Sequence, residues 1–193
     1  MMREYVNQMD GLWGLMVGDA LGVPAEFKDR EMLRRMPVMM MTGFGTHWQE
    51  VGTWSDDTSM TLATMNSLCR SLDYENGEDV YLTASLRQYR RMKKMSECKQ
   101  LEEKEIRSTG FVVHTLETAV WCLLTTNSFK ECVLKAVNLG GDTDTVAAVA
   151  GSLAGYVYGR NEEDGIPQEW RQQLSRFEWL EGKVEKFHKT LSL

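Results

Sequence analysis

The sequence predicts an all-α protein, a helical bundle with one long loop, and three observations support that prediction. Apolar residues recur at helical spacing through most of the chain. Only three prolines occur among 193 residues, so few segments are excluded from helix interiors. Strand signals are poor, since the one β-like stretch is the Met-rich PVMMMTGF at 37–44. These features favour helices packed on helices.

The predicted helices span 7–21, 56–72, 78–95, 111–125, 128–138, 143–158, 167–176 and 180–190. The second begins at Asp56, directly after Ser55, and both residue types suit a helix start. The third carries the basic run RQYRRMKK at 87–94, which is either a solvated face or a phosphate contact. The fourth and fifth hold Cys122 and Cys132 within apolar patterns, as expected of small buried side chains in a reducing compartment.

Small residues line one face of the first and sixth predicted helices. They recur at helical steps of three or four, which places them on one side of a helix. They are Gly11, Gly14, Gly18 and Gly22 in the first helix and Ala147, Gly151, Gly155 and Gly159 in the sixth. A glycine inside a helix costs roughly 1 kcal/mol relative to Ala, so a compensating contact is required. We therefore expect central helices packed nearly backbone to backbone, with Gly151 and Gly155 facing the Gly14 and Gly18 helix.

Two stretches are predicted to be irregular. The segment 23–54 exceeds the usual length of a connection, and such loops are often functional. The segment 96–110 is charged, which indicates a surface position.

Length and composition restrict the class of protein. With 193 residues we expect one domain spanning 1–193. The net charge of −6 argues against a non-specific nucleic-acid partner. The longest apolar run, 146–159, is too short to span a bilayer, and residues 1–10 lack the apolar core of a signal peptide. We expect a cytoplasmic protein with no membrane association, and the sequence does not indicate an oligomeric state.

Two similar clusters combine acids with hydroxyl groups. They are GTWSDDTSMT at 52–61 and NLGGDTDTVA at 138–147. Each suits a helix cap, since Ser and Asp accept bonds from free backbone N–H groups. A cap needs one acceptor, however, and each cluster holds two adjacent or alternate carboxylates. If the two helix starts meet, four carboxylates share a volume in which they repel unless a cation is bound. Hard oxygen ligands suit Mg²⁺ or Mn²⁺.

A third acidic element, GDALGVPAE at 18–26, follows the first helix. Asp19 is interpreted either as a local cap or pairing residue or as part of the acidic site. Glu26 lies beyond Pro24 at the start of the long loop and is a candidate carboxylate close to a metal.

The stretches GLWGLMVGDALGVPAE, WSDDTSM and NLGGDTDTVAAVAGSLAGYVYG occur in that order. Together they resemble the three metal-site blocks of the ADP-ribosylglycohydrolase family, and 108–145 resembles its C-terminal half almost without a gap. The resemblance covers about 7–72 and 108–178. It implies an all-α orthogonal bundle and a hydrolase that uses two Mg²⁺ or Mn²⁺ ions. Members of the family cleave the bond between C1 of the terminal ribose of ADP-ribose and a protein or small-molecule acceptor.

The resemblance also implies roles for single residues. Those matching the family's metal ligands are Ser55, Asp56, Asp57, Asp142, Asp144 and Thr145. Glu26 matches a glutamate beside the metals and the ribose, and Phe111 and His114 match a region that approaches the substrate. A metal-bound carboxylate, Asp56 or Asp144, is expected to take the proton of the attacking water.

Several assignments stay open. His114 lies on a helix rich in Val, Leu and Trp, so it is either a packed core residue or a substrate contact. Trp54 is either a core anchor or a stacking partner for a base or ribose. Gly140 and Gly141, at a helix start, are expected to offer N–H groups to a diphosphate.

The segment 73–107 departs from the family pattern. It has no counterpart of the Gly-Asn-Gly-Ser-type block that in relatives helps to bind the phosphates and the distal ribose. We predict a hydrolase acting on ADP-ribosylated proteins or small molecules. The alternative is a catalytically silent relative that binds ADP-ribose or serves a structural role.

Overall fold

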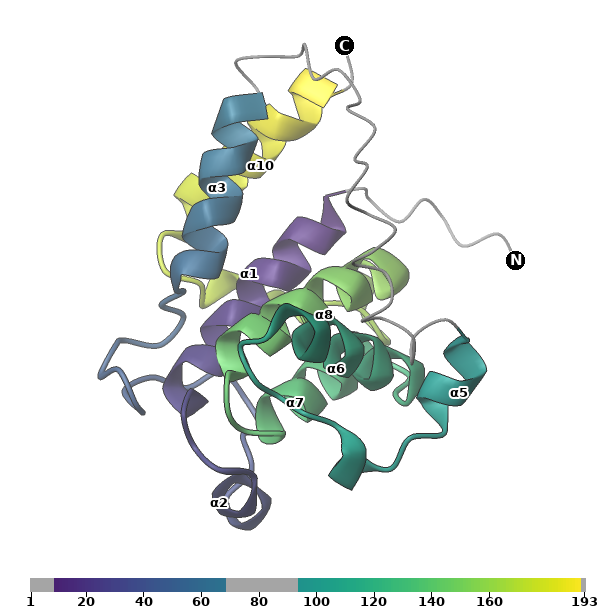
Figure 1. Cartoon of the computed structure of the whole chain (residues 1–193). Coiled ribbons are helices and arrows are strands. Elements are labelled where there is room, and N and C mark those ends of the chain that lie inside the picture. The colour runs from purple at the N-terminus through teal and green to yellow at the C-terminus, as the bar shows by residue number, and fades with distance from the viewer. Residues whose placement is uncertain (1–8, 69–93, 192–193) are drawn as a thin grey trace.

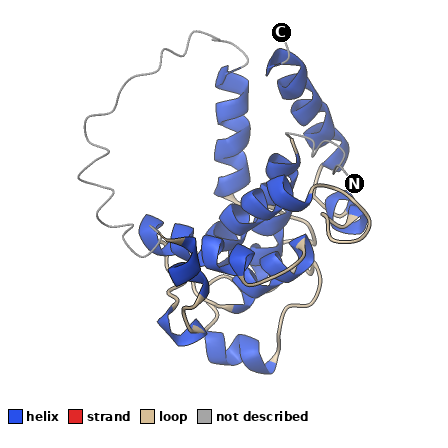
Figure 2. Cartoon of the chain, turned by 90° about the vertical axis from the view of Figure 1, so that its right-hand side faces the viewer, coloured by secondary structure: helices blue, strands red, loops and turns tan. Residues whose placement is uncertain are grey.

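The described residues of the computed structural model, 9–68 and 94–191, form helices and connecting loops without a strand (Figures 1 and 2). This confirms the all-α prediction. The longer helices are α1 (Asp10–Gly22), α3 (Asp56–Leu68), α6 (Val112–Leu124), α7 (Phe129–Asn138), α8 (Thr143–Tyr158) and α10 (Phe177–Leu191). The short ones are η1 (Val23–Ala25), α2 (Arg30–Arg35), α5 (Met95–Lys99), η3 (Glu103–Glu105) and α9 (Gln168–Gln172).

Helices α1 and α8 form the centre of the molecule and run antiparallel (Figure 1). A Cβ built on Gly14 would lie 2.0 Å from the carbonyl oxygen of Gly151, and one on Gly18 would lie 2.0 Å from that of Ala147. A Cβ on Gly155 would lie 2.2 Å from the carbonyl oxygen of Asp10. No side chain fits at these distances, so the prediction of backbone-to-backbone packing is confirmed.

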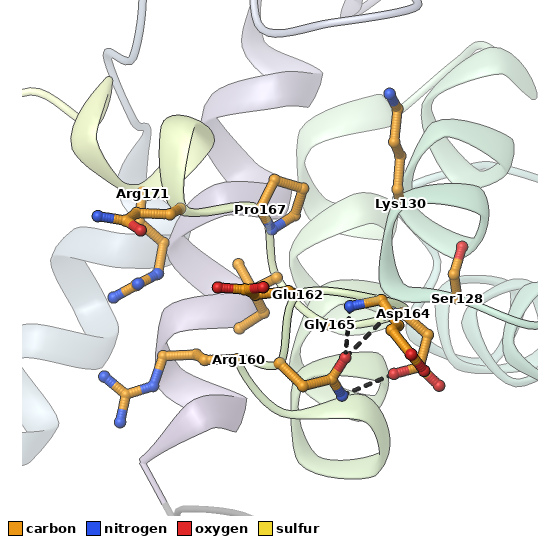
Figure 3. Close-up of a pocket in the computed structure, with 12 residues that line it drawn as sticks. Ser128, Lys130, Arg160, Glu162, Asp164, Gly165, Pro167 and Arg171 are labelled. Atoms are coloured by element: carbon orange, nitrogen blue, oxygen red, sulfur yellow. Dashed lines mark hydrogen bonds between the residues drawn. The ribbon is translucent and has the colours of Figure 1, made fainter.

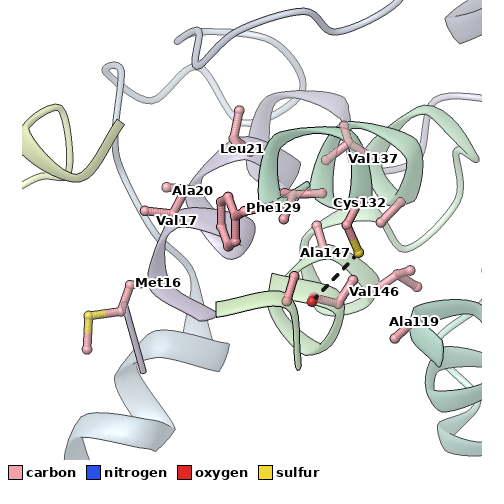
Figure 4. Close-up of a cluster of buried hydrophobic side chains, with 14 of the residues drawn as sticks. Met16, Val17, Ala20, Leu21, Ala119, Phe129, Cys132, Val137, Val146 and Ala147 are labelled. Atoms are coloured by element: carbon pink, nitrogen blue, oxygen red, sulfur yellow. Dashed lines mark hydrogen bonds between the residues drawn. The ribbon is translucent and has the colours of Figure 1, made fainter. Parts of the chain in front are cut away.

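The hydrophobic core fills the space between this helix pair and helices α6 and α7 (Figure 4). Leu21 of α1 and Phe129 and Val137 of α7 are fully buried in this cluster, and so is Met16, whose side chain points away from α7 (Figure 4). Cys132 is also buried and directs its Sγ toward the carbonyl oxygen of Ala150, 4.0 Å away. Cys122 and Cys132 are buried free thiols, as expected of small core residues, and Cys98 is buried as well.

Helix α10 packs against α3, away from the core formed by α6 and α7 (Figure 1). Phe177 at the start of α10 contacts Trp13 of α1, with ring centroids 5.6 Å apart. Within the described ranges, no helix is long and apolar enough to cross a membrane.

The predicted loop 23–54 is more structured than expected. It contains η1 and the six-residue α2, whose cap is Asp29: its side chain accepts a bond from the Met32 N–H at 2.8 Å. The β-like stretch 37–44 forms no strand and contributes one isolated bridge, between Phe44 and Gln49. The predicted helix at 78–95 lies outside the described residues except for its last two positions.

Candidate metal centre

The close approach of α1 and α8 brings the end of one helix to the start of the other. A Cβ on Gly22 would lie 2.3 Å from the Cα of Asp144, so the last turn of α1 touches the first turn of α8. The hydroxyl of Thr143 donates to the Gly22 carbonyl at 2.8 Å and fixes this contact. The glycine series in the sequence therefore determines where Asp144 lies.

Asp19 of α1 joins the start of α3 to the same place. Its carboxylate is fully buried and accepts bonds from the Ser55 N–H and the Thr58 N–H at 3.0 Å, and from the Thr58 hydroxyl at 2.6 Å. These donors are the free groups of a helix N-terminus, which residues within the same helix often cap. Here the acceptor belongs to another helix, so Asp19 anchors α3 and points Asp57 toward α8.

Five carboxylates form two overlapping groups in the described part of the chain. In the first, one oxygen each from Asp19, Asp57 and Asp144 lie within 4.8 Å of one another. In the second, the same holds for Glu26, Asp142 and Asp144. Asp144 belongs to both groups, and the Thr145 hydroxyl bonds the Asp57 carboxylate across the two helix starts. The starts of α3 and α8 thus meet, as a shared acidic site requires.

Burial and neighbouring acids disfavour the charged forms of Asp57 and Asp144. Burial, together with a hydrogen bond to Asp142 and the charge of Glu26, raises the pKa of Asp144 from 3.8 to about 7. Burial and the charge of Asp19 raise the pKa of Asp57 to about 6. In the described ranges, no Lys or Arg forms an ion pair with any of the five carboxylates.

The chemistry of this donor set fits a hard divalent cation. Carboxylate oxygens dominate, the hydroxyls of Ser55 and Thr145 lie beside them, and no thiol belongs to either group. Mg²⁺ and Mn²⁺ prefer such oxygen ligands, and a cation would relieve the repulsion that the folded chain imposes. The residues present therefore fit the metals that the sequence led us to expect.

The loop that carries Asp142 is held on both sides by backbone hydrogen bonds. The Gly141 N–H donates to the Lys28 carbonyl at 2.9 Å, and the Asp142 N–H donates to the Ser108 carbonyl at 3.2 Å. The Gly140 N–H donates to the Val137 carbonyl at 3.2 Å. The expectation that Gly140 and Gly141 offer free N–H groups to a diphosphate is therefore corrected, because both donors are used within the protein.

These glycines are instead needed for their backbone shape. Gly140 and Gly141 have φ values of +73° and +77°, in the left-handed region that L side chains rarely adopt. Arg30 locks the same loop in place: its guanidinium donates to the carbonyls of Leu139, Glu103 and Ile106 at 2.8–2.9 Å. Three separate segments are thus tied together beneath Asp142.

The structure places the other predicted residues around the two groups. Asp56 is exposed and belongs to neither of them. Phe111, half exposed, and His114 begin α6 with ring centroids 5.1 Å apart. They border the site through Gly110, where a Cβ would lie 2.8 Å from Oδ2 of Asp142. His114 is therefore at the edge of the acidic site, half-buried, rather than in the core.

The sequence left the role of one acid open and gave no role to one neighbour of the site. Asp19 was interpreted either as a local cap or as part of the acidic site, and its bonds to the start of α3 depend on how the helices pack. His47 was given no role, yet its Nε2 lies 2.5 Å from Oε2 of Glu26. Trp54, by contrast, donates its Nε1–H to the Ser175 carbonyl at 3.1 Å and packs on the core, which favours the anchoring interpretation.

A separate hollow of about 450 Å³ lies near the C-terminal end of α8 (Figure 3). Its charged lining residues are Lys130, Arg160, Arg171, Glu162, Glu163 and Asp164. Because three basic and three acidic side chains line it, its charge does not select a ligand of either sign. Since α8 is 16 residues long, this hollow and the acidic groups are separated by about 24 Å along the helix.

Comparisons with known proteins agree with this geometry. A family model described as ADP-ribosylglycohydrolase matches the chain in two overlapping segments, 8–95 and 76–192. The match includes 73–107, for which the motifs alone had suggested no counterpart. A solved structure described as an ADP-ribosylglycohydrolase-related protein complex superposes with a TM-score of 0.70 and 22% identity. The alignment covers 95% of this chain and 97% of that one, and it supports the fold.

Curated relatives match over shorter stretches. An ADP-ribosylarginine hydrolase of Pseudomonas putida is 46% identical over 79 residues, which are 41% of this chain and 20% of the relative. An ADP-ribosyl-[dinitrogen reductase] glycohydrolase of Rhodospirillum rubrum is 42% identical over 67 residues, 35% of this chain and 22% of the relative. ADP-ribosylhydrolase ARH3 of Mus musculus is 31% identical over 86 residues, which are 39% of this chain and 22% of the relative. The chain thus spans less than a quarter of the length of these relatives.

Proposed function

Because the chain belongs to the ADP-ribosylglycohydrolase family, we propose that it is a hydrolase that cleaves the glycosidic bond between ADP-ribose and its acceptor. The observation that carries the proposal is the convergence of Glu26, Asp57, Asp142 and Asp144, which come from three separate parts of the sequence. These are positions that match the family's metal-site blocks. Their contact requires the same α1–α8 packing that the glycine series encodes.

The proposed cofactor is a pair of divalent cations, Mg²⁺ or Mn²⁺. Asp19, Asp57 and Asp144 would hold one, and Glu26, Asp142 and Asp144 the other, with hydroxyls of Ser55 and Thr145 beside them. When bound, such ions supply a Lewis acid for oxygen atoms of the substrate and lower the pKa of a water.

The remaining roles belong to side chains of this chain. Asp144 or Asp56 accepts the proton of the attacking water; Asp56 is exposed and outside both groups, which leaves its carboxylate available. Glu26 positions a ribose hydroxyl from the opposite side of the group. Phe111 and His114, whose rings meet edge to face at the border of the site, form a wall for the substrate.

We propose ADP-ribosylated proteins or small molecules as substrates. A conjugate on arginine is the first to test, because two proteins named ADP-ribosylarginine hydrolase are among the relatives with the highest identity. Conjugates on serine and on small alcohols follow, since the acidic groups themselves do not select the acceptor.

The second candidate function is that of a catalytically silent relative. It is favoured by the lack of a Gly-Asn-Gly-Ser-type motif in 73–107, a segment that the family model nevertheless matches. Such a protein would bind cations and ADP-ribose without turnover.

Incubation with ADP-ribosylated arginine and serine peptides tests the proposal, with free ADP-ribose as the readout. We expect release with Mg²⁺ or Mn²⁺, no release in EDTA, and none from an Asp144→Asn variant. Binding of Mn²⁺ and of ADP-ribose without release from any conjugate would support the silent relative instead. Absence of any response to either cation would contradict both.

A further inference from the structure

The residues 43–49 form a small hairpin that packs on the segment carrying Glu26. A bridge between Phe44 and Gln49 closes it, and the Trp48 N–H donates to the Phe44 carbonyl at 2.7 Å. Thr46 attaches the hairpin: its N–H donates to the Pro24 carbonyl at 3.1 Å and its hydroxyl to the Glu26 carbonyl at 2.7 Å. These two bonds attach the hairpin to the segment that carries Glu26.

The backbone of this region is strained in several places. Phe27, Phe44 and Trp48 have φ values of 63°, 69° and 54°, in a region that bulky L residues rarely occupy. Gly45 fits so closely that a Cβ would lie 2.1 Å from the Pro24 carbonyl oxygen. Strained residues of this kind persist where the surrounding structure imposes them, and they cluster at functional sites.

The hairpin brings His47 to the carboxylate of Glu26. Nε2 of His47 lies 2.5 Å from Oε2 of Glu26, and the imidazole meets the Phe27 ring edge to face at 6.0 Å. An ionised carboxylate only accepts hydrogen bonds, so the imidazole donates from Nε2. The His47 side chain is 40% exposed and that of Glu26 is 15% exposed, so His47 contributes little to the core and approaches Glu26 from the solvent side.

Glu26 has two sets of neighbours. Its carboxylate lies within 4.8 Å of oxygens of Asp142 and Asp144, and Nε2 of His47 lies within hydrogen-bond distance of one of its oxygens. Because a carboxylate has two oxygens, a bond from His47 to one leaves the other free to ligate. Substituting a group that holds a ligating side chain in this way typically weakens metal affinity about 10–100-fold.

We propose that His47 is a positioning residue that holds the Glu26 carboxylate against Asp142 and Asp144 and thereby raises the affinity of this group for a divalent cation. The proposal rests on the function proposed above, in which the group binds Mg²⁺ or Mn²⁺. In this proposal the strained hairpin holds the Nε2–H of His47 in a fixed position beside Glu26.

Two substitutions distinguish the effect of the His47 N–H donor from that of its aromatic ring. His47→Phe keeps a ring against Phe27 and removes the N–H, whereas His47→Gln keeps an N–H of similar reach and removes the ring. Gln49→Ala is the control, because its side chain is exposed on the same hairpin and, among the described residues, forms no hydrogen bond with Glu26. Mn²⁺ binding to the full chain is measured by titration calorimetry.

We expect His47→Phe to weaken Mn²⁺ binding about tenfold, with His47→Gln recovering most of the loss and Gln49→Ala unchanged. In a Glu26→Gln background, His47→Phe should have no further effect, because His47 acts through Glu26. This second comparison distinguishes positioning from general damage to the hairpin, which would weaken binding in both backgrounds.

The possible outcomes distinguish the role of His47 from the proposed metal-dependent function. If wild type binds Mn²⁺ and His47→Phe binds it equally well, the role of His47 is wrong and the proposed function stands. If His47→Phe weakens binding equally with and without Glu26, His47 does not act through Glu26. If wild type binds no Mn²⁺, the proposed function and this inference are both wrong.

Discussion

Asp144 and Asp57 are acids whose charge state depends strongly on the fold. The pKa of Asp144 is raised to about 7 and that of Asp57 to about 6, in both cases mainly by burial. An acid with a raised pKa binds its proton in the folded chain at pH values where the unfolded chain has lost it. Without metal, these two acids therefore reduce stability as the pH rises from about 4 toward 7.

The first prediction follows from this loss of stability with rising pH. In EDTA, the melting temperature of wild type should fall between pH 5 and pH 8 relative to that of Asp144→Asn, because the amide cannot ionise. Scanning calorimetry at both pH values measures the difference. Saturating Mn²⁺ should remove most of the fall in wild type. A wild-type curve parallel to that of Asp144→Asn would contradict the raised pKa.

The second prediction concerns Asp56, which is exposed and outside both acidic groups. If it accepts a proton, Asp56→Asn should keep the stabilisation by Mn²⁺ and lose ADP-ribose release about 10²-fold or more. Asp144→Asn should lose both. Melting temperature with and without Mn²⁺, measured beside release, distinguishes them. Loss of the Mn²⁺ response in Asp56→Asn would make Asp56 a ligand instead.

The sequence indicated part of this site and not the rest. Asp57, Asp142 and Asp144 stood out because each cluster holds more acids than a cap needs. The role of Asp19 stayed open, because its three donors, the N–H groups of Ser55 and Thr58 and the Thr58 hydroxyl, reach it only through tertiary packing. His47 reaches Glu26 only through the turn of a hairpin that has no strand periodicity.

At the scale of elements, the α1–α8 pair positions the acids. The third prediction is that Gly151→Leu lowers the free energy of unfolding by about 1–3 kcal/mol or more, since a Cβ there would lie 2.1 Å from the Gly14 carbonyl oxygen. It should also weaken Mn²⁺ binding, because α8 carries Asp144. Urea denaturation measures the first effect.

Gly182 in α10 supplies the matched control. A Cβ there would meet nothing within 4 Å. Gly182→Ala should therefore stabilise the protein by up to about 1 kcal/mol, the ordinary gain of helix propensity. A destabilisation of Gly151→Leu no larger than the experimental error would show that α1 and α8 are not packed as described.

Helix α8 was predicted with its observed bounds, 143–158, because Asp142 precedes it and Gly159 follows it. In the structure Gly159 ends the helix with a φ of +68°. Helix α2 was missed although its signals were present: Asp29 as the cap and Arg34 and Arg35 in its last turn. Six residues carry too little periodicity to outweigh the surrounding loop character.

At the scale of the whole molecule, the short chain still brings all three acidic segments together. A solved chain of similar length shares the fold, so an arrangement of this size is not unusual for it. We propose that 1–193 is one domain, consistent with the single hydrophobic cluster that links the described helices.

The central claim is that the shared acidic groups bind divalent cations, and anomalous diffraction from crystals containing Mn²⁺ tests it most directly. We predict anomalous difference peaks beside Asp144, one bordered by Asp19 and Asp57 and the other by Glu26 and Asp142. A single peak within one group would reduce the site to one metal. No peak at either group, from crystals in which Mn²⁺ is present, would contradict the metal centre and the hydrolysis proposed to depend on it.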